Sequence, residues 1–126
     1  MRYTLALFGE AEKGEFGIPY RINSLPELAD KLGNPPQETC GIPFAIQALL
    51  YERLVYFTRV PEEGFSKPEY MRGLCRFEEI SEPISALCMP GVADEEIIRV
   101  SDRLLAYHSA LLLTTEQDLY DYLTNS

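Results

Sequence analysis

The stretch that decides the fold is residues 3–17, which reads YTLALFGEAEKGEFG. Its first part, residues 3–8, is a short apolar run, and such a run predicts a β-strand buried inside a domain. Three glycines follow, and Gly9 and Gly14 have the spacing of the two glycines in a phosphate-binding P-loop. The stretch therefore predicts a first strand that ends in either a nucleotide site or a structural turn.

The glycine turn lacks the side chains that bind phosphate. In a P-loop the second glycine is followed by a lysine that reaches the terminal phosphates and by a hydroxyl residue that holds magnesium. Here Gly14 is followed by Glu15, and the Gly-x-Gly-x-x-Gly spacing of a dinucleotide loop is also absent. Glu10 and Glu12 add negative charge that Lys13 does not balance. We therefore predict an exposed turn without a phosphate ligand.

Helical and strand patterns alternate along the rest of the chain. Apolar residues at helical spacing predict helices at residues 24–33, 42–53, 66–77, 94–104 and 116–125. Runs of β-branched, aromatic and other apolar residues predict strands at residues 54–60, 84–91 and 109–115. Four residues are expected to cap helix N-termini: Ser24, Ser66, Asp94 and Thr115.

This alternation predicts a single α/β domain over residues 1–126. The expected architecture has three layers, with a mainly parallel sheet of about four strands and helices on both faces. A chain of 126 residues is long enough for one core and too short for two. Right-handed crossovers between the parallel strands are expected.

Charge and composition exclude several classes of partner. The chain carries 20 acidic and 11 basic residues, for a net charge of −9, and its basic residues are scattered, so we expect no nucleic-acid partner. No segment approaches the roughly 20 continuous apolar residues of a membrane span. The three cysteines, Cys40, Cys75 and Cys88, are widely spaced and predict free thiols in a reducing cytoplasm.

No residue is assigned as catalytic, cofactor-binding or metal-binding. His108, the single histidine, could pair with Cys88 at a strand end, but its place near a helix end favours a partner of the helix dipole. Asp94, Glu95 and Glu96 occupy successive helical positions and so point in different directions rather than converging on a metal. No cofactor is expected.

Several stretches, in this order, resemble the core domain of contractile tail sheath proteins, which are found in phage tails and related injection machines. The matching stretches are LFGEAEKGEFGIPYRINSLPELADKLG (7–33), FAIQALLYERLVYFTRV (44–60), ISALCMPGVADEEIIRVSDRLL (84–105) and SALLLTT (109–115). In that family the glycine stretch is a structural turn, and subunits assemble into tubes by donating terminal strands to a neighbour's sheet. The resemblance implies a building block rather than an enzyme.

The chain also departs from the family. The first predicted strand begins at Tyr3 and the chain stops at Ser126, so we expect it to lack the family's terminal arms. The family's inserted outer domain is missing between Val60 and Ile84. We expect partners to be the protein itself or other tail- or sheath-type proteins, bound through a sheet edge or a helix face. The expected location is the cytoplasm, or a virion or injection particle assembled there.

Two other functions remain open from the sequence. A small Rossmann-like enzyme would bind a nucleotide or other substrate at the carboxyl ends of the strands, near Gly9, Glu10, Pro90, Gly91 and Thr115. An acidic adaptor would instead bind a partner protein through a helix face. Three tyrosines could contribute to such an interaction surface: Tyr107, Tyr120 and Tyr122.

Overall fold

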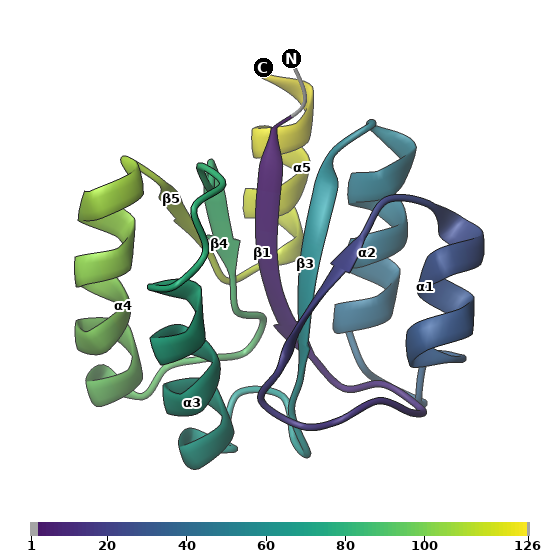
Figure 1. Cartoon of the computed structure of the whole chain (residues 1–126), viewed down its shortest axis with the longest axis horizontal. Coiled ribbons are helices and arrows are strands. Elements are labelled where there is room, and N and C mark those ends of the chain that lie inside the picture. The colour runs from purple at the N-terminus through teal and green to yellow at the C-terminus, as the bar shows by residue number, and fades with distance from the viewer. Residues whose placement is uncertain (1–2, 126) are drawn as a thin grey trace.

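The computed structural model describes residues 3–125 and shows one α/β domain (Figure 1). The strands are β1 (Thr4–Gly9), β2 (Pro19–Ile22), β3 (Leu54–Arg59), β4 (Ala86–Cys88) and β5 (Leu111–Leu113). The helices are α1 (Leu25–Leu32), α2 (Gly41–Leu50), α3 (Lys67–Phe77), α4 (Glu95–His108) and α5 (Glu116–Thr124). Residues 1, 2 and 126 of the predicted domain lie outside the described residues.

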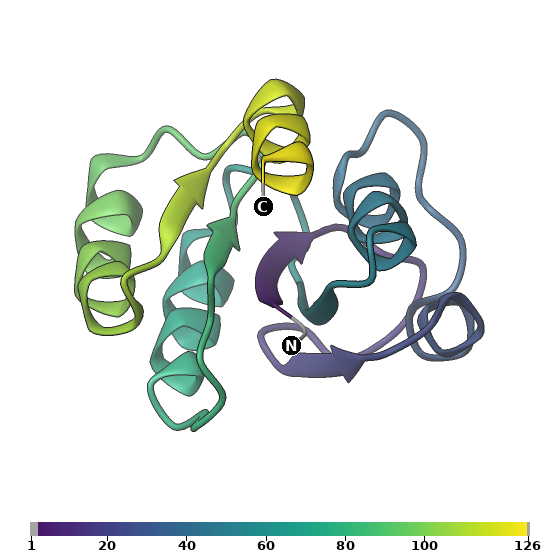
Figure 2. The same ribbon diagram turned by 90° about the horizontal axis from the view of Figure 1, so that it is seen from above.

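The strands form one sheet in the order β2-β3-β1-β4-β5. β1, β3, β4 and β5 run parallel to one another, and β2 alone is antiparallel, paired with β3. Helices α1, α2 and α5 cover one face, and α3 and α4 cover the other (Figures 1 and 2). The three-layer architecture and the mainly parallel sheet predicted from the sequence are confirmed.

The chain reverses its direction along the sheet once. From β1 it moves outward to the edge strand β2 and returns to β3, and from β3 it passes back over β1 to reach β4 and then β5. Right-handed crossovers that run in opposite directions place their helices on opposite faces, which explains why α2 lies opposite α3 and α4. The reversal leaves a switch point between β1 and β4, the place where open α/β sheets commonly bind ligands.

Strand β1 lies at the centre of the core. All six of its residues are buried, and its side chains alternate between the two faces of the sheet. Leu5 and Leu7 pack in the cluster under α2 and α5, whereas Phe8 packs on the other side under α3. The Phe8 ring stacks on Tyr70, with ring centroids 5.2 Å apart. The buried first strand predicted from the sequence is therefore confirmed.

Strand β2 and the strand lengths were not predicted correctly. Residues 19–22 were expected to belong to the glycine-bearing loop, but they pair with β3 at the edge of the sheet. The strands expected at residues 84–91 and 109–115 contain only three paired residues each. One reason is that Pro90 lacks an N–H to donate and Gly91 has a positive φ of 79°, so the chain leaves the sheet after β4.

The predicted helix caps are mostly confirmed. Ser24 accepts a hydrogen bond from the N–H of Glu27, Asp94 accepts from two N–H groups of α4, and Thr115 accepts from α5. The expected role of Ser66 is wrong, because its hydroxyl donates to the carbonyl of Glu62 and accepts from the same residue's N–H. Ser66 closes a turn before α3 instead of capping the helix.

Candidate functional site

The switch point at the carboxyl ends of the strands is closed by close backbone contact. Gly9 ends β1 and lies against Gly41 at the start of α2, so a Cβ atom on Gly9 would be 2.5 Å from the Gly41 Cα atom. A Cβ atom on Gly64 would lie 2.6 Å from the carbonyl oxygen of Gly91. Only glycine permits such approaches. These glycines bring the backbone segments together where an enzyme of this fold would hold its substrate.

The side-chain carboxylate of Glu63 accepts hydrogen bonds from backbone N–H groups at the switch point. Its Oε2 atom accepts hydrogen bonds from the N–H groups of Glu10 (2.9 Å) and Gly41 (2.8 Å), and Oε1 accepts from Cys40 (2.8 Å). In return, the N–H of Glu63 donates to Oε2 of Glu10 at 3.0 Å. The N-terminus of α2 carries a partial positive charge that attracts anions. Here that end of the helix is already bound to the protein's own carboxylate.

Several amide groups of the glycine turn are hydrogen-bonded within the chain. The N–H groups of Glu12 and Lys13 both donate to the carbonyl of Leu32, at 3.0 and 3.1 Å. The N–H of Glu15 donates to the hydroxyl of Tyr20 at 2.8 Å. A phosphate cradle needs amides directed at the ligand, whereas these amides fasten the turn to α1 and β2. Glu12, Lys13 and Glu15 are exposed, as expected for the turn predicted from the sequence.

Arg59, at the end of β3, holds the same turn from the other side. Its guanidinium donates to the carbonyl oxygens of Ala11 (3.1 Å) and Gly14 (2.7 Å) and lies 4.3 Å from the centre of the Phe16 ring. The sequence did not indicate that Arg59 would hold the glycine turn or that Glu63 would hold the switch point. The hydrogen bonds from Arg59 to Ala11 and Gly14 cross 48 and 45 residues, those to the Glu63 side chain cross 22, 23 or 53, and no local motif marks either residue.

The structure separates His108 from Cys88. Cys88 is the last residue of β4, whereas His108 lies beyond the other end of that strand and accepts a hydrogen bond at Nδ1 from the N–H of Ile84 (3.1 Å). His108 is the last residue of α4, at the helix end that the sequence indicated, and because its Nδ1 accepts a hydrogen bond the ring is neutral in this arrangement. Burial lowers the pKa of His108 and raises the pKa of the Cys88 thiol.

The remaining candidate residues do not gather into one site. Asp94 caps α4, and within residues 3–125 no group of three or more histidine, cysteine or acidic side chains could hold a metal ion. Tyr107 is exposed on α4, and Tyr120 is exposed on α5, which covers the opposite face of the sheet. Tyr122 is half-buried, and its hydroxyl is hydrogen-bonded to that of Ser85.

The two edges of the sheet are protected to very different degrees. The edge strand β2 contains Pro19 and the charged residue Arg21, both of which discourage pairing with another strand. The side chain of Arg21 forms an ion pair with Glu82, with Nε and Oε1 2.9 Å apart. The Nζ atom of Lys31 donates to the carbonyl of Arg21 at 3.4 Å. The β2 edge is thus guarded by proline and by charged side chains.

The opposite edge, strand β5, consists of three leucines without proline or charge. The N–H of Leu111 donates to Ser85 at 3.2 Å, and the carbonyl of Leu113 accepts from Met89 at 2.9 Å, so both residues direct these backbone groups toward β4. Backbone groups alternate along a strand, and the N–H and C=O of Leu112 therefore point outward. Among the described residues, no strand pairs with this side of β5.

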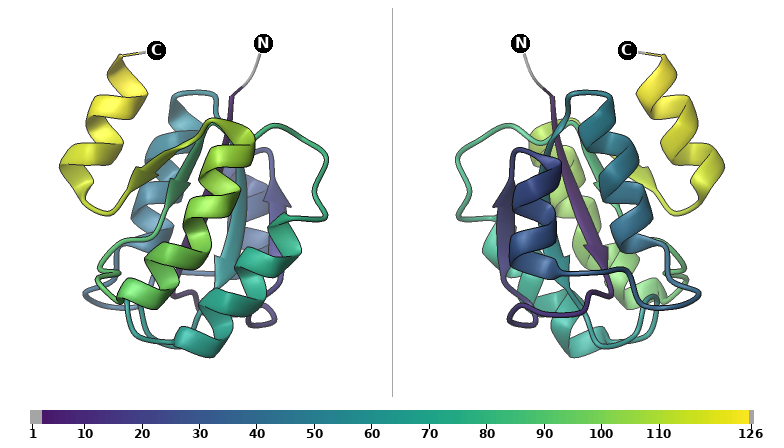
Figure 3. Two further views of the ribbon diagram at one scale, coloured as in Figure 1. Left: turned by 90° about the vertical axis from the view of Figure 1, so that its left-hand side faces the viewer. Right: turned by 90° about the vertical axis from the view of Figure 1, so that its right-hand side faces the viewer.

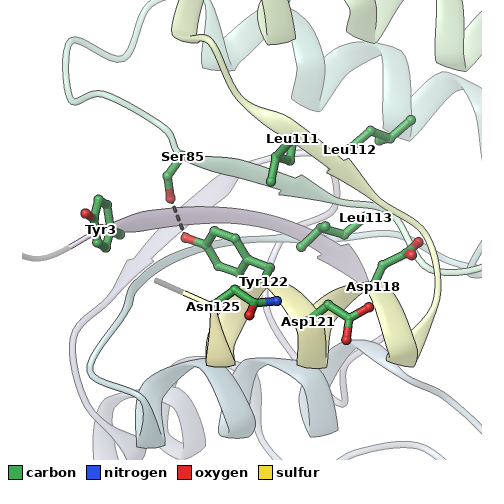
Figure 4. A pocket seen from close by; sticks show the side chains of 9 residues that line it. All are labelled: Tyr3, Ser85, Leu111, Leu112, Leu113, Asp118, Asp121, Tyr122 and Asn125. Carbon is green, nitrogen blue, oxygen red and sulfur yellow. Dashed lines mark hydrogen bonds between the residues drawn. The ribbon is translucent and has the colours of Figure 1, made fainter.

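A groove of about 470 Å³ lies between β5 and α5 (Figure 4). The ribbon views show that α5 covers this face of the sheet only in part (Figure 3). Leu111 is 58% exposed on this face. The lining residues are Tyr3, Ser85, Leu111, Leu112, Leu113, Asp118, Asp121, Tyr122 and Asn125. The open strand edge and this groove together, called here the β5 surface, are the strongest candidate for a functional site.

A comparison of the chain with family models, with curated proteins and with solved structures found no match. Among residues 3–125, no helix combines the length and the apolar character needed to cross a membrane. The candidate site therefore rests on the geometry of this chain.

Proposed function

We propose that this protein is a non-enzymatic assembly protein that joins a partner through the β5 surface. The observation that carries the proposal is the contrast between the two sheet edges. Proteins usually protect edge strands with proline, charge or a covering segment, as β2 is protected here. The leucine-only edge of β5 lacks the first two, so it can accept a further strand by β-augmentation.

The closed switch point supports an assembly role over the alternative of a small Rossmann-like enzyme. A substrate phosphate at the carboxyl ends of the strands would compete with the Glu63 carboxylate for the amides of Glu10 and Gly41. It would also meet the negative charge of Glu10 itself. The sheath-like sequence motifs agree with an assembly role, and membership of a tail or injection particle is part of the same proposal.

The edge itself is short, which limits what backbone pairing can contribute. Only Leu112 directs both of its backbone groups outward, and the N–H of Thr114 is held by Asp118 at 3.2 Å. A partner strand would therefore gain only two or three backbone hydrogen bonds, each worth about 1 kcal/mol net. The exposed Leu111 and the groove beside it must supply the rest of the contact.

The proposal is tested with a matched pair of leucine variants. Leu111→Lys places a charge on the β5 surface, whereas Leu50→Lys places the same charge on α2, where the leucine is 66% exposed. Both variants and the wild type are applied to an array of extended eight-residue peptides with alternating apolar positions, and the mass of each protein in solution is measured over a range of concentration.

Binding to peptides, or self-association, that is lost in Leu111→Lys and kept in Leu50→Lys is the expected result. A monomer that binds no peptide on the array would refute the assembly role. Thermal stabilisation by a nucleotide would also refute it, since a ligand at 100 times its dissociation constant adds about 2.7 kcal/mol of stability.

A further inference from the structure

The charged side chains that line the groove beside β5 are all acidic, and the buried guanidinium of Arg53 lies behind two lining rings, 5.3 Å from the centres of Tyr3 and Tyr122. Two of the nine lining residues are aspartates, Asp118 and Asp121, and none of the nine is lysine, arginine or histidine. Both aspartates belong to α5, which also carries Glu116 in its first turn and has no basic residue. The remaining lining residues include three leucines and two tyrosines. The groove thus combines an apolar floor with an acidic rim.

We propose that the occupant of the β5 surface is an extended segment of a different protein, in which apolar residues alternate with lysine or arginine. This inference rests on the proposed assembly function and specifies its partner. An extended segment paired with Leu112 directs every second side chain toward the α5 side of the sheet. The basic side chains lie on that side and reach the rim, and the apolar side chains lie on the opposite face, beside Leu112, which packs toward α4.

Basic side chains fit both parts of the groove. Lysine and arginine have long aliphatic stems that cover apolar surface while their charged ends stay in water. On this surface the stems lie over Leu111 and Tyr122, and the charged ends reach Asp118 and Asp121. Figure 4 shows the two aspartates on α5, across the groove from Leu111 and Leu113. An acidic segment would meet repulsion at the same two positions.

A second copy of this chain is a poor occupant of the same surface. Each copy carries a net charge of −9, so two copies repel one another at long range. The exposed strand of a second copy, ALLLTT at residues 110–115, has no basic residue to place against the aspartates. If two copies paired symmetrically through their β5 edges, their two acidic α5 helices would also lie close to the junction between the sheets.

The experiment measures the affinity of three synthetic probe peptides by fluorescence anisotropy. The first alternates lysine with valine over eight residues, the second alternates glutamate with valine, and the third alternates lysine with serine. The test protein carries Asp118→Asn and Asp121→Asn. The control protein carries Asp30→Asn and Asp102→Asn, which remove the same charge from exposed positions on α1 and α4.

The lysine–valine peptide is expected to bind the wild type and the control protein, and the other two peptides are expected to bind at least tenfold more weakly. Exposed ion pairs are individually weak, so loss of both aspartates should reduce the affinity by about 2- to 30-fold. Raising the salt concentration should also reduce the affinity of the wild type for the lysine–valine peptide, and it should reduce the affinity of the test protein less.

The outcomes separate this inference from the proposed function. If Leu111→Lys abolishes binding but the glutamate–valine peptide binds as well as the lysine–valine peptide, the partner is not basic and only this inference fails. It also fails alone if the wild type forms dimers that Leu111→Lys disrupts. If Leu111→Lys changes neither peptide binding nor association, both the inference and the assembly function fail.

Discussion

The carboxylate of Glu63 gives the sharpest test of how the switch point is held together. It joins the loop after β1 to the start of α2, because its two oxygens accept from the N–H groups of Glu10, Cys40 and Gly41. The substitution Glu63→Ala leaves all three N–H groups without this acceptor and removes the negative charge at the N-terminus of α2. Water can reach Glu63 and Cys40, so part of the loss is recovered by solvation.

The loss of folding stability expected for Glu63→Ala follows from the number and exposure of these hydrogen bonds. A hydrogen bond to a charged group contributes about 1.5–3 kcal/mol when it is well shielded. Two of the three hydrogen bonds are only partly buried and the third is exposed, so each is expected to contribute about 1 kcal/mol, or roughly 3 kcal/mol in total. For a chain of this size, each kcal/mol lowers the melting temperature by about 4 °C, and a fall of about 10 °C is expected.

Two further variants make the result interpretable. Glu63→Gln keeps one acceptor oxygen but loses the charge, so its destabilisation should lie between those of the wild type and Glu63→Ala. Glu62→Ala removes a neighbouring exposed carboxylate, and a surface change of this kind is expected to alter stability by no more than about 0.5 kcal/mol. Urea unfolding followed by circular dichroism gives the free energy of each variant.

The reasoning is refuted if Glu63→Ala unfolds at the same urea concentration as Glu62→Ala. That result would mean that solvent satisfies the three N–H groups as well as the carboxylate does, and that the switch point is open to external anions. A loss close to 3 kcal/mol would instead establish Glu63 as a structural anion that keeps the strand ends closed.

Two other measurements test the packing around this site and the role of the single histidine. Gly9→Ala should destabilise the fold by about 1–3 kcal/mol, because its Cβ would lie 2.5 Å from the Cα of Gly41; an unchanged urea midpoint would contradict this. Burial lowers the pKa of His108 from its ordinary value of 6.5, so the folded chain binds a proton less readily than the unfolded chain. The contribution of His108 to the free energy of unfolding should be complete above pH 6.5 and should be lost as the pH falls through the folded pKa. The difference in stability between the wild type and His108→Gln, measured across this pH range, should show this loss.

Much of the fold could be predicted from local features of the sequence. The buried run of β1 and the apolar stripes of the helices each reflect contacts within a few residues or the plain need to bury apolar surface. Ser24, Asp94 and Thr115 cap their helices because capping depends on N–H groups two or three positions away. The same local rule failed at Ser66, where the neighbouring Glu62 backbone offered the hydroxyl another partner.

The candidate site could be predicted only in part. The sequence indicated that the glycine turn lacks a phosphate-binding lysine, and it suggested a sheet edge as a contact surface without identifying the strand. It did not reveal β2, because a four-residue segment that includes Pro19 and the exposed Arg21, with Ile22 as its one buried residue, carries little strand signal until β3 lies beside it. It also did not reveal that the leucines of β5 form an open edge, since a leucine run looks the same in a central strand.

The sequence alone determined the alternation of strands and helices, the acidity of the surface and the absence of a complete phosphate-binding motif, because each depends on residue type and short-range spacing. Only the tertiary structure decided which strands lie at the edges, which side chain meets the N-terminus of α2, and that the aspartates of α5 face the leucines of β5. Those relations join residues far apart in the chain, and the order of the strands in the sheet, which brings them together, is set by packing of the whole domain.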